Sequence, residues 1–323
     1  MKAKLVGCNG IAPIMLVLWV VSAGLSAERG PERERSVQGI RTSNRTVLTG
    51  PQGDPFEMPS DAAVGPDGNL YVLDGVHHRV VVYDAEARFR FQFGRYGSEP
   101  GQLHFPLGIA ASPDGKIYVA DSGNHRVHVF ASNGTPLDVI ALPSMASQAP
   151  PDPTDVVVDS ARARLYIADN DNHHILVYNL ASRRFEAVWG GPGQGERQFR
   201  FPFLMDLTPQ GYVLVVEPIN TRVQVLNSAG KFVNFIGGWG VKPGQLFRPK
   251  GVTTCDDRVF VTDSYLGSIQ VFDMSGSLLG VLADDAGLPM KFITPTGVAA
   301  DAERKRLYVV ELKAHRVCRV DLE

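Results

Sequence analysis

The eight histidines are the side chains of this sequence best suited to metal chemistry, and their spacing decides whether they could perform it. His78, His125, His173 and His315 each follow an acidic residue by four positions, within segments that resemble one another. Equivalent positions of repeated units lie far apart in a folded protein, so these imidazoles cannot share a zinc ion that needs its ligands at ~2 Å. We therefore predict structural roles for the histidines, no metal site and no cofactor.

The acids in these segments recur with a regular period. They end short apolar runs such as Ile117–Ala120, and successive acids are 47, 48, 48, 46 and 48 residues apart. We predict that they form a hairpin network with neighbouring turn residues, because a buried carboxylate needs hydrogen-bond donors. The predicted members of this network are Asp74, Asp121, Asp169 and Asp263, together with His125 and Arg126.

Each unit of about 47 residues must supply the strands that position these side chains. A unit reads as four short runs rich in Val, Ile, Phe and Tyr, and turn sequences such as Pro113-Asp114-Gly115 separate them. Repeats of this length with four strands each are typical of a β-propeller. The sequence thus predicts an all-β, six-bladed propeller with four strands per blade. Residues 45–50 would complete the last blade as its missing fourth strand, with residues 36–40 a weaker candidate for that place.

The segment Ile117–Phe130 resembles the NHL repeat, and the likeness extends over the mature chain from Thr46 to Leu322. The copies ending at Glu217 and Asp263 depart most from the pattern. The resemblance implies a six-bladed propeller. Related propellers include an amidating lyase with zinc histidines in its central channel and gluconolactonase-like enzymes with a channel-bound divalent cation. Here the positions corresponding to the zinc histidines are not histidine, and Asp61, Asp155 and Asp206 are the only channel candidates for the second chemistry.

The first residues have the three parts of a secretory signal peptide, namely early lysines, an apolar run over residues 11–21 and small residues before Ala27. We predict a signal peptide over 1–27, a flexible charged tether over 28–44 and the propeller over 45–323. The protein would be periplasmic or extracellular, or membrane-anchored if the segment stays uncleaved. After removal of the signal peptide the cysteines are Cys255 and Cys318, which lie in different repeats. Whether they are free thiols or form a disulfide is open at this point.

Charge and loop composition indicate the class of function. With 32 basic and 34 acidic residues the net charge is −2, which opposes nucleic-acid binding. Aromatic and basic residues collect in the turns and inter-blade loops that share one face of a propeller, as in a protein-binding patch. The candidates are Tyr265, Trp239, Phe203, Arg200, Tyr96, Ile219 and Lys313. The favoured function is a monomeric, non-catalytic scaffold that binds a protein or peptide; a channel-metal enzyme is the alternative.

Overall fold

The computed structural model describes residues 37–144 and 149–323, so the predicted signal peptide and the tether up to residue 36 lie outside the described residues. Within the described residues, strands account for nearly all the regular structure, together with three short 3-10 helices. These helices are η1 (Ser122–Asn124), η2 (Ser160–Arg162) and η3 (Leu312–Ala314). None of the described helices has the length and apolar character that a membrane crossing requires.

Four separate sheets each contain four strands that follow one another in sequence and pair antiparallel. The first has β2 (Pro59–Val64), β3 (Leu70–Asp74), β4 (Arg79–Tyr83) and β5 (Phe89–Phe93). The second has β6 (Pro106–Ala111), β7 (Lys116–Asp121), β8 (Arg126–Ala131) and β9 (Pro136–Ala141). The third has β10 (Pro153–Asp159), β11 (Arg164–Asp169), β12 (His174–Asn179) and β13 (Arg184–Gly190). The fourth has β14 (Met205–Leu207), β15 (Val213–Glu217), β16 (Arg222–Leu226) and β17 (Phe232–Gly237).

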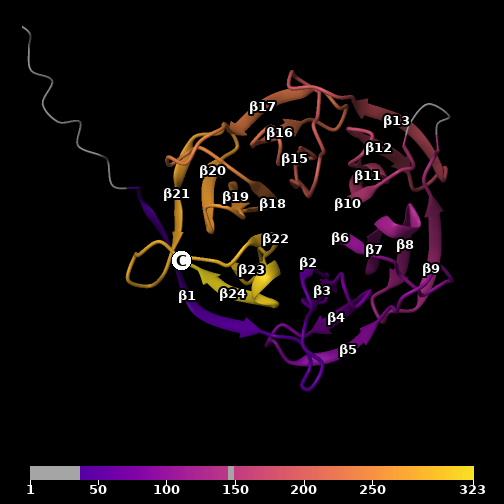
Figure 1. Ribbon diagram of the computed structural model, residues 1–323, viewed down its shortest axis with the longest axis horizontal. Coiled ribbons are helices and arrows are strands. Elements are labelled where there is room, and N and C mark those ends of the chain that lie inside the picture. Colours follow the sequence, from indigo (N-terminus) through magenta and orange to yellow (C-terminus); the bar gives the residue numbers. More distant parts are fainter. Residues whose placement is uncertain (1–36, 145–148) are drawn as a thin grey trace, which may run out of the picture. The chain divides into compact units, whose positions relative to one another are not determined.

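The fifth sheet has eight strands in the order β18-β19-β20-β21-β1-β24-β23-β22. Its C-terminal strands are β18 (Pro249–Cys255), β19 (Arg258–Asp263), β20 (Ser268–Asp273), β21 (Leu278–Ala283), β22 (Pro295–Asp301), β23 (Arg306–Glu311) and β24 (Arg316–Leu322). The sheets stand around a common centre, with β2, β6, β10, β14, β18 and β22 innermost (Figure 1). The part of the chain from residue 37 onward is thus an all-β, propeller-like fold with four-stranded blades.

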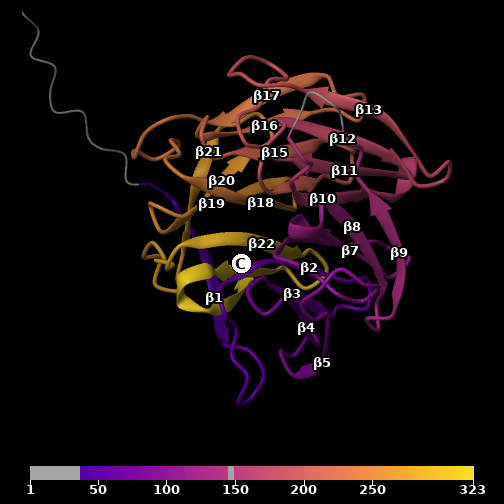
Figure 2. The same cartoon turned by 45° about the vertical axis from the view of Figure 1, so that its right-hand side comes forward.

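Strand β1 (Gly39–Leu48) joins the two ends of the ring. Residues 42–48 pair antiparallel with β24, while residues 39–41 pair parallel with β21. Figures 1 and 2 show β1, in indigo, passing beside both the orange strand β21 and the yellow C-terminal strands. The predicted tether boundary is therefore wrong, because residues 39–44 belong to a strand and Thr42 is buried with its hydroxyl donating to the Ala283 carbonyl oxygen at 2.8 Å.

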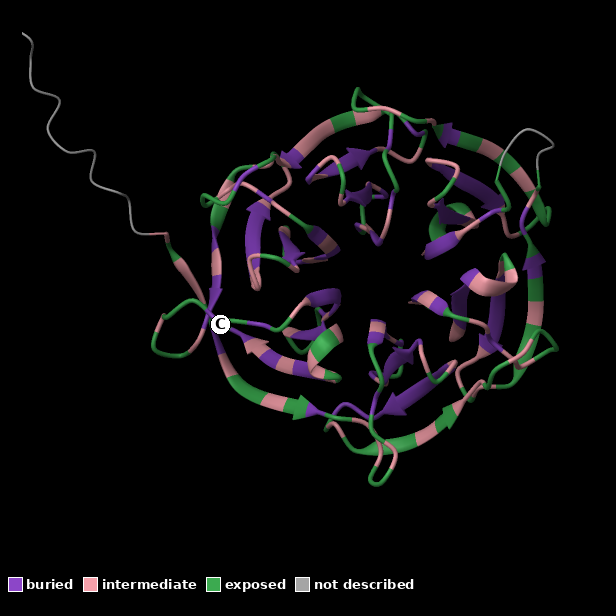
Figure 3. Ribbon diagram, viewed as in Figure 1, coloured by how far each residue is buried: buried purple, intermediate pink, exposed green. Residues whose placement is uncertain are grey.

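Burial explains why the inner strands read as continuous apolar runs. Every residue of β3, β4 and β15 is buried or nearly so, because neighbouring sheets cover both faces of each inner strand. The outermost strands carry mostly exposed and half-buried residues, which alternate along β13 (Figure 3). Cys255 and Cys318 are free thiols in one apolar cluster, and burial raises the pKa of each.

Candidate functional site

One face of the ring is built from two kinds of connection, which we call together the loop-rich face. These are the turns that follow β3, β7, β11, β15, β19 and β23 and the loops that lead into the innermost strands β2, β6, β10, β14, β18 and β22. Side chains of the turns hold the loops directly. Asn124 Nδ2 donates to the Gly97 carbonyl oxygen at 2.9 Å, and the Arg126 guanidinium donates to the Ser98 carbonyl oxygen at 2.6 Å.

The predicted hairpin acids anchor these contacts. The Asp121 carboxylate accepts from the His104 backbone N–H at 2.6 Å, from Asn124 Nδ2 at 2.8 Å and from Arg126 Nε at 2.7 Å. Asp74 and Asp169 likewise accept from the backbone of the preceding loop and from a side chain of their own turn. Each acid thus connects a turn to the loop before its sheet, and the face is held as a defined surface.

Asp263 performs this task without a basic partner. Its carboxylate accepts from four backbone N–H groups, those of Phe247 and Arg248 in the loop and those of Tyr265 and Leu266 in the turn. These bonds fix the backbone of Tyr265 while leaving its side chain 61% exposed. The Tyr265 ring lies 4.3 Å from the Phe247 ring, centroid to centroid.

His125 departs from its predicted role, since its ring does not contact the acid of its own hairpin. Its Nδ1 lies 2.6 Å from the Pro151 carbonyl oxygen in the segment that leads to the next sheet. The equivalent histidines His78, His173 and His315 also reach the neighbouring sheet, where Nδ1 accepts a backbone N–H at 3.0–3.1 Å. These histidines therefore link successive blades, and an accepting Nδ1 must be unprotonated.

The donors to those three histidines are residues that the sequence analysis missed. Met58, Phe105 and Phe201 each precede a proline and have φ near +50°, a left-handed conformation that is rare for large side chains. All three side chains are exposed on the loop-rich face. A large apolar residue directly before the proline of an inner strand was the signal that could have identified them.

Exposed apolar side chains are concentrated on this face. Of the seventeen large hydrophobic residues exposed in the described part of the chain, seven lie in outermost strands and the other ten in the loops and turns of the loop-rich face. The ten are Met58, Tyr96, Phe105, Phe201, Ile219, Trp239, Val241, Tyr265, Leu288 and Ile293.

The structure places the predicted binding residues as follows. Trp239 (74% exposed), Tyr96, Tyr265 and Ile219 project from the loop-rich face with most of their surface accessible. Arg200 and Lys313 are exposed as well. Phe203 is half-buried, and the Lys250 ammonium nitrogen lies 4.4 Å from the centre of its ring.

Trp239 and Tyr96 occupy equivalent places in two loops of the same construction. Each forms an isolated parallel bridge with a buried leucine seven residues on, Trp239 with Leu246 and Tyr96 with Leu103. Within both loops a glutamine carboxamide oxygen accepts a backbone N–H, at 3.1 Å for Gln245 and 3.0 Å for Gln102. Both aromatic residues therefore stand on backbone that is already ordered. A partner that binds them would lose little further conformational entropy in ordering these loops.

The channel candidates Asp61, Asp155 and Asp206 line a central cavity of about 220 Å³. Each carboxylate accepts from the next inner strand: Asp61 from the Ile109 backbone N–H at 3.1 Å, Asp155 from that of Met205 at 2.6 Å, and Asp206 from the Thr254 hydroxyl at 2.8 Å. Burial raises the pKa of all three, that of Asp61 to about 7. The three acids thus connect the innermost strands, and their raised pKa values lower the fraction of each carboxyl group that is ionised.

Glycines make room for two of these carboxylates. A Cβ on Gly297 would lie 2.2 Å from a carboxylate oxygen of Asp61, and a Cβ on Gly108 equally close to one of Asp155. No histidine lines this cavity, and the described residues contain no group of three or more His, Cys, Asp or Glu that could hold a metal ion.

Parts of the chain are similar to known proteins. The NHL repeat family model matches residues 56–83 and 103–130. Over 51 residues the chain is 41% identical to the protein brain tumor of Drosophila melanogaster, a match that covers 16% of this chain and only 5% of that protein.

Two solved structures illustrate the fold. A gluconolactonase from Xanthomonas campestris superposes with a TM-score of 0.64 at 13% identity, covering 83% of this chain and 87% of the other. Virginiamycin B lyase from Staphylococcus aureus superposes with a TM-score of 0.53 at 13% identity, covering 85% and 83%. Similarity of this degree concerns the fold alone. The chain therefore contains two segments that match the NHL repeat, and its fold is that of a propeller-like scaffold.

Proposed function

We propose that this protein is an exported, non-catalytic NHL propeller that binds a protein or peptide through its loop-rich face. In this proposal the eight-stranded sheet counts as two blades, β18–β21 and β22–β24 with β1, which gives six blades in all. The observation that carries the proposal is the concentration of exposed apolar side chains on one face. A surface of this kind on a folded domain is typical of an interaction site.

Trp239 and Tyr265 are the proposed anchors. Both side chains are large and amphipathic, both stand on backbone that is fixed by hydrogen bonds, and such residues supply most of the energy of protein interfaces. Phe203 beneath Lys250 offers a third, partly covered contact. Arg200, in the loop between β13 and β14, and Lys313, in the turn between β23 and β24, are exposed and favour a partner that carries acidic groups beside its apolar ones.

The channel bears on the alternative, an enzyme with a channel-bound metal. Asp61, Asp155 and Asp206 each accept a hydrogen bond from a neighbouring strand, and no cluster of potential metal ligands exists in the described residues. The alternative, an enzyme with a channel-bound metal, therefore draws no specific support from this geometry. The predicted signal segment would bring the protein to the cell envelope or the exterior, where the partner is expected.

A displayed peptide library panned against the immobilised protein tests the proposal. We expect enriched peptides that bind the wild type, and we expect Trp239→Ala and Tyr265→Ala to weaken them by about 1–3 kcal/mol, that is, about 5- to 150-fold. Phe89→Ala is the matched control, because Phe89 is an exposed aromatic residue of the outer strand β5. Equal losses for the control, or peptides that bind all variants alike, would refute the assignment of the face.

A further inference from the structure

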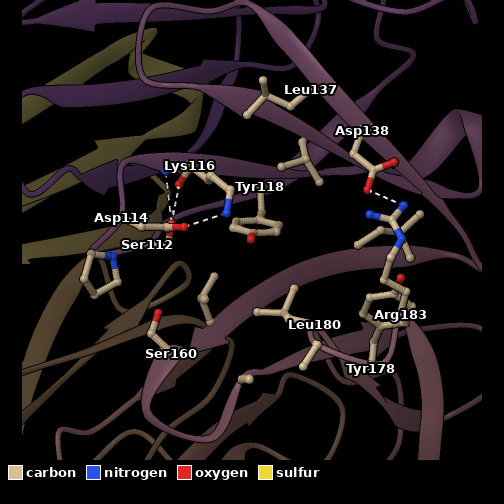
Figure 4. Close-up of a pocket in the computed structure, with 16 residues that line it drawn as sticks. Ser112, Asp114, Lys116, Tyr118, Leu137, Asp138, Ser160, Tyr178, Leu180 and Arg183 are labelled. Carbon is tan, nitrogen blue, oxygen red and sulfur yellow. Dashed lines mark hydrogen bonds and ion pairs between the residues drawn. The ribbon is translucent and has the colours of Figure 1, made fainter.

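A cavity of about 940 Å³ lies between the β6–β9 and β10–β13 sheets (Figure 4). Its residues come from the turns between first and second strands, from the turn between β12 and β13 and from strands that face one another across the junction. It is thus distinct from the loop-rich face and from the central channel. Nothing in the sequence repeat predicts it.

Two other junctions are filled by a contact that is missing at this cavity. In the hairpin between β8 and β9, Gly134 packs so closely on the Phe93 ring of the preceding sheet that a Cβ would lie 2.6 Å from it. Gly230 makes the same approach to Trp189, at 2.5 Å. In each case a turn glycine lies against a large aromatic residue of the neighbouring outer strand and closes the gap.

Both halves of this contact change at the open junction. The turn between β12 and β13 contains no glycine and is one residue longer: Tyr178 pairs with Phe185 seven positions on, whereas Phe130 pairs with Pro136 six positions on. The outer-strand position that holds Phe93 or Trp189 elsewhere is Ile140 in β9. A smaller side chain and a displaced turn leave the space unfilled.

The composition of the cavity wall indicates what it would bind. Val129, Leu137, Ile140, Val158 and Leu180 form apolar surface beside the Tyr118 and Tyr178 rings. Cavities of ~300–1,000 Å³ with mostly apolar walls and a few polar groups are typical of small-molecule sites.

The charged residues of the rim already have partners. Lys116 Nζ lies 2.6 Å from an Asp114 oxygen, and the Arg183 guanidinium lies 2.7 Å from an Asp138 oxygen. Figure 4 shows the Tyr118 ring between these two ion pairs. Because each charge on the rim is neutralised by its neighbour, the cavity offers no net attraction to an anion or a cation.

Tyr118 provides the polar contact. The equivalent hydroxyls of Tyr71 and Tyr166 have protein acceptors, the Ser132 carbonyl oxygen at 3.1 Å and an Asp159 oxygen at 3.4 Å. Among the described residues the Tyr118 hydroxyl has no such partner, as is also the case for the equivalent Tyr308, and the Tyr118 residue is only 3% exposed. Burial, and then the charge of Asp114, raise its pKa to about 12, so the hydroxyl remains a donor.

We propose that this inter-blade cavity binds a small uncharged molecule with an apolar body and a hydrogen-bond acceptor that faces Tyr118. The inference does not depend on the loop-rich face, and either proposal can fail alone. The probe for its test is 6-propionyl-2-(dimethylamino)naphthalene, which is uncharged, apolar, carries a ketone oxygen and fluoresces more strongly in dry surroundings.

Titration of this probe into wild type and four variants tests the proposal. Ser160→Trp places a large side chain at the cavity rim, and we expect at least tenfold weaker binding. Its matched control is Ala302→Trp, because Ala302 has the equivalent position beside Asp301 that Ser160 has beside Asp159. We expect no change for this control or for Trp239→Ala.

Tyr118→Phe removes only the hydroxyl and keeps the ring, so it tests the polar contact even if Ser160→Trp fails to fold. Loss of a neutral hydrogen bond corresponds to about two- to tenfold weaker binding. The proposal is overturned if the wild type shows no saturable binding, or if Ser160→Trp folds and binds the probe as tightly as Ala302→Trp. Unchanged binding by Tyr118→Phe would overturn the role of the hydroxyl.

Discussion

The buried Asp61 carboxylate makes the stability of this propeller depend on pH in a direction opposite to that of most carboxylates. Its pKa of about 7 lies well above the ordinary value of 3.8, mainly because burial penalises the charged form. Between these two values the folded protein binds a proton that the unfolded chain has released. The contribution of Asp61 to the free energy of unfolding therefore falls as the pH rises from about 4 to about 7, and then stays constant.

Asp61→Asn removes this titration while its amide oxygen can still accept the Ile109 N–H. With the two pKa values above, linkage predicts that the wild type loses about 2–3 kcal/mol more than the variant between pH 5 and pH 8, while the contributions of Asp155 and Asp206 are common to both. Urea unfolding at both pH values measures it. Asp285→Asn is the control, because Asp285 is exposed in a loop and should not alter the difference.

The reasoning is refuted if wild type and Asp61→Asn lose the same free energy between pH 5 and pH 8. It is equally refuted if the variant becomes less stable than the wild type at pH 8, because the charged carboxylate would then be stabilising.

Three further predictions follow from the same contacts. Removal of residues 1–36 should leave the free energy of unfolding nearly unchanged, whereas removal of 1–48 deletes β1 and should cost several kcal/mol; equal melting temperatures would contradict the closure. Asp121→Ala removes the buried carboxylate that accepts from the His104 N–H, Asn124 and Arg126 and should cost about 1–3 kcal/mol in urea unfolding, and a cost below about 0.5 kcal/mol would contradict a supporting role. Burial, more than the nearby His104, lowers the pKa of His78, so the folded state binds fewer protons than the unfolded chain and the contribution of His78 to stability falls below about pH 6.5. His78→Asn should reduce that fall, and thermal melts at pH 5 and 7 measure it.

The repeat unit could be predicted from the sequence because its signals are local. The period of the acids, the β-rich runs and the proline before each inner strand depend on neighbouring residues, and they recur in every blade. The exposure of Trp239 and Tyr265 could be predicted for the same reason, because the repeat pattern places both residues in connections outside the strands.

Features that depend on two blades could not be predicted in this way. Strand β1 pairs with both β21 and β24, and only the assembled ring brings these two edges together. The reach of His125 to the next sheet and the open junction beside Ile140 are likewise set by contacts between units, which no single repeat encodes.

Site-specific photo-crosslinking in the cells that produce the protein tests the loop-rich face most directly. A benzoylphenylalanine in place of Trp239 or Tyr265 would react with whatever lies against that face, and one in place of Phe89 reports on the outer strands. The account predicts that both positions of the face yield adducts with the same discrete protein or peptide, while the Phe89 position does not. Adducts of equal yield at all three positions, or none at the face, would contradict it.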